Sequence, residues 1–365
     1  MKNSWLELNF AVLRDNIQSI VHALNRRAEL VLVVKSNAYG HGLAAVSRCA
    51  WENGVRRFAV ADMDEAAILR RMFPQAAIMM LGIIQPDDVE AAIAGDIEVV
   101  LVDEEHGAAL ASATRARPRA LRCHAKIDTG MGRIGFAWDR AAESIARLAQ
   151  SGGLTFSGIF SHFASSAAED RRFADLQMER FLGAVEACRL KGVTIPFRHM
   201  SNSGAFLRNA AWDLDGVRIG IHLYGYGGAP PSARSRTRPM LQWKSGLVQV
   251  KRVPAGSPIG YDSTHVTPAA TTIGVVPVGY ANGYSRHLSN KGRVIVNGRL
   301  CPVVGRVSMN YITVDLGPEG ADRPRDEVVL MGQQGQASVW ADQLAEWCGT
   351  IPHEILTGIR SIAAG

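Results

Sequence analysis

The feature that most constrains the fold of this chain is a regular alternation, over its first two-thirds, of short apolar runs with segments of helical periodicity. Eight runs have the character of buried β-strands, and they cover residues 30–34, 57–61, 77–81, 97–102, 121–127, 155–160, 195–200 and 217–221. Several of the segments between them open with Asp or Pro and end near Gly, as helices do. Eight strands separated by helices indicate parallel βα units, and this number fits a closed (β/α)8 barrel better than an open sheet.

A different pattern begins after about residue 232. Residues 230–239, PPSARSRTRP, are typical of a linker. The β-like runs that follow are joined by Gly, Pro and Asn turns, and they cover residues 245–253, 271–279, 292–298, 300–316 and 326–332. Only residues 337–348 have helical periodicity. The sequence therefore predicts an α/β fold: a (β/α)8 TIM-type barrel over residues 10–232, followed by a mostly β C-terminal domain of residues 233–365, joined by residues 1–9 as one more strand.

Composition and charge narrow the class of protein. Hydrophobic residues make up 47% of the chain and charged residues 20%, an ordinary globular balance. The net charge is +6, but the arginines are scattered rather than clustered with aromatic residues, so we expect no nucleic-acid partner. The five cysteines form no CxxC pair, which favours a reducing compartment. With no signal peptide and no apolar stretch of about 18 residues, we expect a cytoplasmic protein with no membrane partner.

Polar residues gather at the carboxyl ends of several predicted strands, which is where the active site of such a barrel lies. In chain order, these residues and their neighbours are Lys35, Tyr39, Lys126, Asp128, Arg133, His162, Asn202, Ser203, Arg218, Gly220 and Ile221. The concentration of such groups at one mouth favours a functional site.

Lysine is scarce in this chain, since only seven of its forty basic residues are lysines. Lys35, at the end of an apolar strand, has a structural interpretation, in which its amine reaches out to solvent. It also has a chemical one, in which desolvation lowers the amine pKa and makes it a nucleophile able to form a Schiff base. Ser203 with the backbone amides of Gly204, Gly220 and Ile221 would form a phosphate cradle. A pyridoxal phosphate (PLP) enzyme needs this layout, which favours the chemical interpretation.

Two other patterns are weaker. GMGRIG at residues 130–135 matches GxGxxG, but it follows the fifth strand and is followed by a helical segment, so we do not expect a dinucleotide site. Four histidines could in principle converge on a metal at the barrel mouth: His41, His162, His199 and His222. The strand ends lack the abundant carboxylates that would favour such a site. No HExxH motif is present, and we expect no metal.

Seven segments, taken in order, resemble the signature segments of the alanine racemases, which are PLP enzymes of fold-type III. They are VVKSNAYGHG, KIDTGMGRIGF, FSHFA, SNSGA, VRIGIHLYG, VGYANGY and GRVSMNYITVDL. The resemblance extends over nearly the whole chain. It implies interconversion of L- and D-alanine, supply of D-alanine for peptidoglycan, and a head-to-tail homodimer with two shared active sites.

The resemblance also implies a role for each residue at a matching position. Lys35 would hold PLP, and Lys35 and Tyr280 would be the two catalytic bases. Arg218 would face the pyridine nitrogen with His162 beside it, and the other cofactor-binding residues are Tyr39, Arg133, Asn202, Ser203, Gly220 and Ile221. Arg133 and the Met309 backbone would bind the substrate carboxylate, while Lys126, carbamylated in many relatives, would orient Arg133. Tyr280 and Met309 would come from the other subunit.

The chain departs from the family pattern at a few positions. Asn282 and Asn310 stand where many relatives have Asp, and Ser308 stands where some have Cys. Ser361 is nearest to a tyrosine that contacts the phosphate in some relatives. Alternatives to an alanine racemase are a racemase of serine or another small amino acid, a non-catalytic PLP-binding barrel, and a fold-type III decarboxylase. The last would need a cysteine and an acidic residue around Met309, where neither is found.

Overall fold

The computed structural model describes residues 3–25, 27–115, 117, 119–319, 321–360 and 362–363, so that Ser361 lies outside the described residues. The chain divides into two compact units. The barrel unit comprises Leu13–Ala38 and Leu43–Thr237, and the β-rich unit comprises Met1–Val12, Tyr39–Gly42 and Arg238–Gly365. None of the helices in the described residues has the length and apolar character that a membrane crossing requires.

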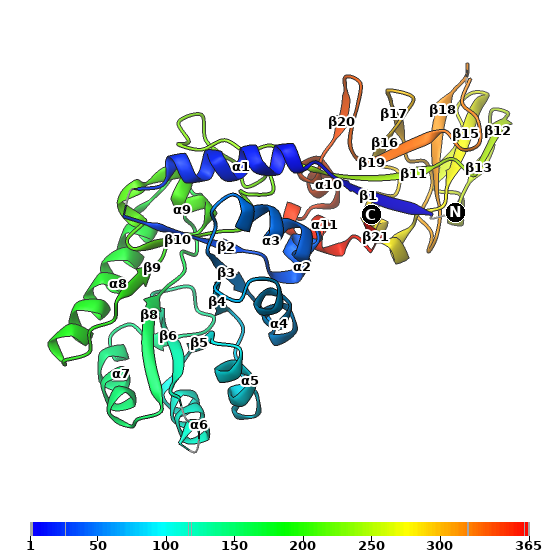
Figure 1. Ribbon diagram of the computed structural model, residues 1–365. Coiled ribbons are helices and arrows are strands. Elements are labelled where there is room, and N and C mark those ends of the chain that lie inside the picture. The colour runs from blue at the N-terminus through cyan, green and yellow to red at the C-terminus, as the bar shows by residue number, and fades with distance from the viewer. Residues whose placement is uncertain are drawn as a thin grey trace. The chain divides into compact units, whose positions relative to one another are not determined.

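The barrel unit contains a closed parallel sheet whose strands follow the order β5-β4-β3-β2-β10-β9-β8-β6, with β6 pairing back to β5. The strands are β2 (Glu29–Val33), β3 (Arg57–Val60), β4 (Ala77–Met80), β5 (Ile97–Leu101), β6 (Leu121–Asp128), β8 (Leu154–Phe160), β9 (Phe197–His199) and β10 (Gly216–Ile219). Each coincides with one of the eight predicted runs. The predicted (β/α)8 barrel is therefore confirmed (Figure 1).

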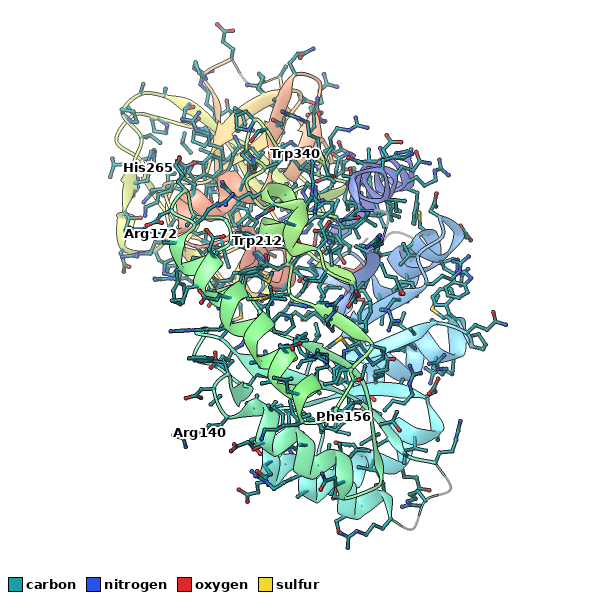
Figure 2. The ribbon with its side chains drawn as sticks, turned by 90° about the vertical axis from the view of Figure 1, so that its left-hand side faces the viewer. Arg140, Phe156, Arg172, Trp212, His265 and Trp340 are labelled. Atoms are coloured by element: carbon teal, nitrogen blue, oxygen red, sulfur yellow. The ribbon has the colours of Figure 1, made fainter. Side chains whose placement is uncertain are left out.

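Helices surround this barrel, as the alternation predicts (Figure 1). They are α1 (Phe10–Ala23), α3 (Leu43–Glu52), α4 (Met63–Met72), α5 (Val89–Ala94), α6 (Glu104–Thr114), α7 (Ala141–Gln150), α8 (Arg172–Leu190) and α9 (Ser203–Arg208), with the 3-10 turns η1 (Pro86–Asp88) and η2 (Ala210–Trp212). Asp62 and Asp103 cap α4 and α6 by accepting backbone N–H bonds, which satisfies donors that a helix start leaves unpaired. Figure 2 views the unit from the side of α8, which begins at Arg172.

The β-rich unit contains two main sheets. One follows the order β17-β16-β19-β11-β1-β21 with β20 added to β19, and the other follows the order β12-β15-β18. Their strands are β1 (Ser4–Leu8), β11 (Leu241–Gly246), β12 (Gln249–Val253), β15 (Thr271–Val276), β16 (Arg293–Val296), β17 (Arg299–Pro302), β18 (Ile312–Gly317), β19 (Glu327–Gln334), β20 (Ala337–Val339) and β21 (Ile362–Ala363). The expected N-terminal strand is confirmed, since β1 pairs antiparallel with β11. The smaller elements are β13 (Pro258–Ile259), β14 (His265–Val266), η3 (Tyr261–Ser263), η4 (Tyr280–Asn282) and η5 (Arg286–Leu288).

Several details of this unit differ from the sequence-based prediction. The predicted run at 245–253 contains β12 but only the last two residues of β11, which begins at Leu241. The apolar run at 300–316 is two strands, β17 and β18, separated by a turn in which the Ser308 hydroxyl binds backbone groups of Tyr311. Helix α10 (Ala341–Cys348) begins later than expected, because the first residues of its segment form β20. A second helix, α11 (Pro352–Gly358), was not predicted, although proline at its first position is a helix-start signal.

Candidate active site

Lys35 lies just beyond the end of β2, at the start of a left-handed turn. Ser36, Asn37, Ala38 and Tyr39 have φ angles of 55°, 54°, 53° and 53°. For residues other than glycine this conformation costs roughly 1–2 kcal/mol each, so a run of four requires support from the surrounding structure.

The support for this turn comes from within the barrel unit. A carboxylate oxygen of Glu65, on α4, accepts the backbone N–H of Asn37 at 2.7 Å. The Asn37 side chain accepts the backbone N–H of Leu43 at 2.8 Å, where α3 begins. The backbone following Lys35 is thereby held in place. The sequence did not identify Glu65, because an acidic residue in the first turn of a helix is ordinarily explained by the helix dipole.

The loop after β6 carries Arg133 and is fixed by Asp128. The Asp128 carboxylate accepts the backbone N–H groups of Gly130 at 2.9 Å and Gly132 at 3.1 Å. Gly135 has a φ of 132°, and a Cβ there would lie 2.8 Å from backbone atoms of β6. The glycines therefore allow the loop to pack on its own strand. The glycine motif does not open a helix, because the two-residue strand β7 (Phe136–Ala137) lies between it and α7. The strand after α7, β8, does not end in the acidic residue that a dinucleotide fingerprint requires.

Several cationic groups act on one another at the mouth of the barrel. Burial and the charge of Arg133 lower the pKa of Lys35. Burial, together with the charges of Arg133 and Arg218, lowers the pKa of Lys126 to about 8. Burial and the charge of Arg218 also hold the pKa of His162 well below its usual range. The structure thus brings together five of the residues singled out in the sequence, and it makes both amines easier to deprotonate than ordinary lysines.

Arg218, on β10, is buried and makes an extensive set of hydrogen bonds. Its Nη1 donates to the Nδ1 of His199 at 2.8 Å and to the carbonyl oxygen of His199 at 3.1 Å. Its Nη2 donates to the carbonyl oxygens of Ser161 at 2.7 Å and Met200 at 3.0 Å, and it lies 3.1 Å from the Nδ1 of His162. The remaining donor, the Nε–H, has no partner among the described residues. Arg218 can therefore offer one fixed N–H to an acceptor on a ligand.

The ends of β9 and β10 meet at Ser203. The Ser203 hydroxyl oxygen accepts the backbone N–H of Gly220 at 3.2 Å and that of His222 at 3.4 Å. Asn202 caps α9, since its side-chain oxygen accepts the backbone N–H of Ala205 at 3.0 Å. Ser203 and Gly220 are thus adjacent, as the expected phosphate cradle requires, with Ile221 following directly. The cap accounts for the side-chain oxygen of Asn202, and its side-chain nitrogen lies 3.5 Å from the Nε2 of His162.

Tyr39, Tyr280 and Met309 belong to the β-rich unit. Tyr39 is buried, with its ring centroid 5.8 Å from that of His353, and burial raises its pKa to about 12. Tyr280 and Met309 are neighbours, because the backbone N–H groups of Tyr280 and Ala281 donate to the carbonyl oxygens of Ser308 and Met309, both at 3.0 Å.

The turn around Tyr280 accommodates one of the departures from the family pattern. The side-chain oxygen of Asn282 accepts the backbone N–H of Gly279 at 3.1 Å, as an aspartate there would. A Cβ on Gly279 would collide with the backbone of Ser308 and Met309, so only glycine allows the two segments to approach. The asparagine therefore preserves the turn that presents Tyr280.

The histidines that could in principle converge on a metal contact protein groups. His199 binds Arg218, and His222 lies 3.1 Å from the hydroxyl of Ser235. The described residues contain no group of three or more His, Cys, Asp or Glu placed to hold a metal ion. The buried Glu98 and His124 were not among the predicted site residues, yet His199 links them by hydrogen bonds to Arg218. A charged residue and a histidine inside apolar strands were the available signals.

Comparison with known proteins tests the resemblance. Residues 8–228 match the family model described as alanine racemase, N-terminal domain, and residues 240–363 match the one described as alanine racemase, C-terminal domain. The chain belongs to the alanine racemase family. Among its curated relatives, the alanine racemase of Carboxydothermus hydrogenoformans is 39% identical over 361 residues, which cover 98% of each protein.

Solved structures of the family lead to the same assignment. The alanine racemase of Bacillus anthracis, with bound L-Ala-P, superimposes with a TM-score of 0.92 at 31% identity, covering 98% of this chain and 93% of that one. The alanine racemase of Bartonella henselae, with covalently bound pyridoxal phosphate, superimposes with a TM-score of 0.87 at 25% identity, covering 99% of both chains. Family membership and the barrel followed by a mostly β domain are both confirmed.

Proposed function

We propose that this protein is a PLP-dependent racemase that interconverts L-alanine and D-alanine. The observation that carries the proposal is the arrangement at the barrel mouth. There, an amine with a lowered pKa, that of Lys35, shares a cationic cluster with Arg218, whose Nε–H is available to a ligand. Membership of the alanine racemase family supports alanine as the substrate.

The residues present fit PLP. When bound, PLP supplies a carbonyl that condenses with amines and a conjugated ring that takes up the charge left by a departing proton. Lys35 would hold the carbonyl carbon, and the Nε–H of Arg218 would meet the pyridine nitrogen. The phosphate would lie by Ser203, Gly220 and Ile221, with Tyr39 as a further contact. The relative from Bartonella henselae carries this cofactor covalently bound.

Arg218 would also determine the electronic state of the ring. A guanidinium only donates hydrogen bonds and does not give up its proton readily, so the nitrogen that accepts from it remains unprotonated. Burial lowers the pKa of Arg218 to about 9, which still leaves it charged at neutral pH. A ring held in this state stabilises negative charge less than a protonated one does, which favours rapid return of the proton over side reactions.

Racemisation requires one base on each face of the substrate Cα, and Lys35 and Tyr280 would provide them. Lys35 would take or return the proton on one face, helped by the burial and by the charge of Arg133 that lower its pKa. Tyr280 would act on the opposite face. Arg133 and the backbone of Met309 would bind the substrate carboxylate and so orient the Cα–H bond.

A homodimer would bring these two groups together. Tyr280, Met309 and Tyr311 of the β-rich unit are 44%, 56% and 52% exposed, a cluster of large apolar side chains of the kind that marks interaction surfaces. In a head-to-tail dimer, this surface of one protomer would face the barrel mouth of its partner. We further propose that the dimer works in the cytoplasm, where its five free cysteines would stay reduced, and supplies D-alanine for peptidoglycan.

Lys126 would orient Arg133 as a carbamate. With a pKa of about 8, roughly one-tenth of the Lys126 amine is neutral at pH 7. The neutral nitrogen would attack CO2, form an N–C bond and release a proton, which leaves a carboxylate beside the guanidinium of Arg133. This change would replace repulsion between two cations with an ion pair.

The test is a racemisation assay on the purified protein supplied with PLP, with alanine, serine, lysine and arginine offered separately as single enantiomers. We expect rapid loss of optical rotation with alanine. We also expect a visible absorption band that borohydride abolishes while adding the mass of the reduced cofactor to the peptide containing Lys35. Binding of PLP without turnover of any amino acid would indicate the non-catalytic alternative. A preference for serine would replace the proposed substrate.

A further inference from the structure

A chain of hydrogen bonds crosses the interior of the barrel from Arg218 to the buried Glu98. Arg218 donates to the Nδ1 of His199 at 2.8 Å. The Nε2 of His199 lies 2.9 Å from the Nδ1 of His124, and the Nε2 of His124 lies 3.2 Å from a carboxylate oxygen of Glu98. The four side chains come from β10, β9, β6 and β5, so the chain links strands on different sides of the barrel.

The donors and acceptors allow only one direction for these hydrogen bonds, from Arg218 towards Glu98. A guanidinium only donates, so the Nδ1 of His199 must accept, and the proton of a neutral His199 ring therefore lies on Nε2. That proton is donated to the Nδ1 of His124, whose own proton consequently lies on Nε2 and is donated to Glu98. Each ring needs only one proton for this arrangement, and burial lowers the pKa of both histidines, which keeps them neutral.

The carboxylate at the far end is held as an anion. Arg57 on β3 donates to Glu98 at 2.9 Å, and Arg122 on β6 donates to its other oxygen. Burial alone would raise the pKa of Glu98, but the hydrogen bond from His124 and the charges of the two arginines lower it to about 2. Glu98 therefore stays ionised and can accept the hydrogen bond that the Nε2–H of His124 donates.

Aromatic packing fixes the planes of the two imidazoles but not their nitrogens. The ring of His199 stacks on that of Phe160, with centroids 4.9 Å apart and planes 8° apart. The ring of His124 meets the edges or faces of Phe160 and Phe197 at steep angles. Such contacts are equally compatible with a ring turned over by 180°. The hydrogen bonds distinguish the two orientations of each ring: the donor group of Arg218 orients His199, and the acceptor group of Glu98 orients His124.

We propose that Glu98 is a positioning residue for the cofactor site: its carboxylate fixes the tautomer and orientation of His124, which in turn supports the His199 ring to which the guanidinium of Arg218 is bound. This inference rests on the proposed function, in which the Nε–H of Arg218 binds the pyridine nitrogen. The interior of such a barrel is ordinarily filled with apolar side chains, and a buried charge there needs well-matched partners to be tolerated. A chain that leads from that charge to the barrel mouth gives it a role beyond packing.

Two substitutions separate the acceptor from the charge. Glu98→Gln removes the charge but keeps an oxygen that can accept from His124 and Arg57, while the half-exposed Arg122 can turn to solvent. Glu98→Met has a similar size and no acceptor. Glu29→Gln is the matched control, because Glu29 binds the same Arg57 at 3.2 Å but takes no part in the hydrogen bonds that link Glu98 to Arg218.

The first measurement is isotope-edited NMR of the histidine nitrogens in the PLP-free protein. We expect both rings in the wild type to carry their proton on Nε2, and we expect the Gln and Glu29 variants to keep that signature. In the Met variant, His124 should show mixed tautomers, because its Nε2–H has lost its acceptor, while the bond from Arg218 still orients His199. A wild-type protein in which either ring is protonated on Nδ1 would overturn the proposal. Because this measurement needs no cofactor, it distinguishes failure of the inference from failure of the proposed function.

The second measurement is the rate at which the holoenzyme releases PLP. In metal sites, removing a residue that orients a ligand typically weakens binding by about ten- to a hundredfold. By analogy, we expect at least about tenfold faster release from Glu98→Met and less than about threefold faster release from the Gln and control variants. If the Met variant does not fold, His124→Phe interrupts the same chain while leaving Glu98 with both arginines, and the same acceleration is expected. The proposal would be contradicted if a folded variant that interrupts these hydrogen bonds released PLP at a rate within threefold of the wild type.

Discussion

The barrel unit and the β-rich unit present their functional residues in opposite ways. At the barrel mouth, four of the donors of Arg218 are bound by protein groups, Ser203 is hydrogen-bonded to two backbone amides, and the loop with Arg133 is fixed by Asp128. In the β-rich unit, the backbones of Tyr280 and Met309 are bonded to each other's segments, while their side chains are about half exposed.

This difference indicates that the two units contribute to a site in different ways. The barrel unit holds its groups ready in fixed orientations, which is what binding of a rigid aromatic cofactor requires. The β-rich unit fixes only the backbone and leaves two large side chains open to solvent, an arrangement that becomes functional when another surface covers it. One unit therefore carries most of a cofactor site, and the other carries a part that we propose is used by a second protomer.

The largest expected effect concerns the barrel unit alone. Lys35→Ala removes both the covalent anchor and one base, so we expect racemisation to fall by at least about 10⁴-fold, since a single general base typically contributes 10²–10⁴-fold and the anchor is lost as well. The visible band of the holoenzyme should disappear too. The matched control is Lys191→Ala, in the same unit, whose amine makes only a long ion pair of 3.8 Å with Glu143 at the surface. Full activity of the Lys35 variant would rule out this site.

The next effect tests whether the two regions belong to different subunits. Tyr280→Phe should reduce racemisation by about 10²–10³-fold, because one of the two bases is lost while the barrel site stays intact. Mixing equal amounts of the Lys35→Ala and Tyr280→Phe proteins under subunit exchange should then restore activity. Half of the dimers would be hybrids with one intact site each, so we expect about one-quarter of the wild-type rate, a statistical estimate for closed two-fold dimers.

Two controls sharpen the mixing experiment. Each variant incubated alone should keep its own reduced rate, and mixing in the absence of subunit exchange should restore nothing. If each active site were built from a single chain, every hybrid would contain only defective sites and no activity would return. Cα-proton exchange in the Tyr280 variant should also be lost more strongly from one enantiomer than from the other.

The sequence predicted the fold well because each of its main signals is local. The apolar runs and helix caps such as Asp62 depend on neighbouring residues, and the (β/α)8 pattern follows from them. The motifs around Lys35 and Tyr280 identified the family for a similar reason. Glu98 and Glu65 were not found, because their partners, His124 and the backbone of Asn37, are 26 and 28 residues away and become neighbours only when the barrel strands pair.

A smaller effect concerns Lys126 at the barrel mouth. Lys126→Ala should lower kcat/KM for alanine by about tenfold, mostly through KM, because Arg133 would lose the group that orients it. Carbon NMR of the wild type in labelled bicarbonate should show a carbamate signal that is absent from the variant. Since the pKa of Lys126 is about 8, the signal should strengthen as the pH rises from 7 towards 8. Wild-type KM in the Ala variant would show that Arg133 needs no such partner.

Of these substitutions, Glu98→Gln should have the smallest effect on activity, but its effect on stability should be measurable. The experiment compares the buried Glu98 of the barrel with Glu29, which lies at the surface. The pKa of Glu98 is about 2 in the folded chain and about 4.5 when unfolded, so the folded state binds fewer protons between these values. Its contribution to the free energy of unfolding is therefore complete above pH 4.5 and is lost as the pH falls through 2. Integrated over that interval, this contribution is on the order of 3 kcal/mol.

The measurement is denaturant unfolding of the wild type and of Glu98→Gln from pH 6 down to pH 2.5. Plotted against pH, the free energies of unfolding of the two proteins should converge on acidification, while those of the Glu29→Gln control should run parallel to the wild type. A constant gap between the wild type and the Glu98 variant would show that Glu98 titrates alike in both states, and that the arginines and His124 do not hold its charge.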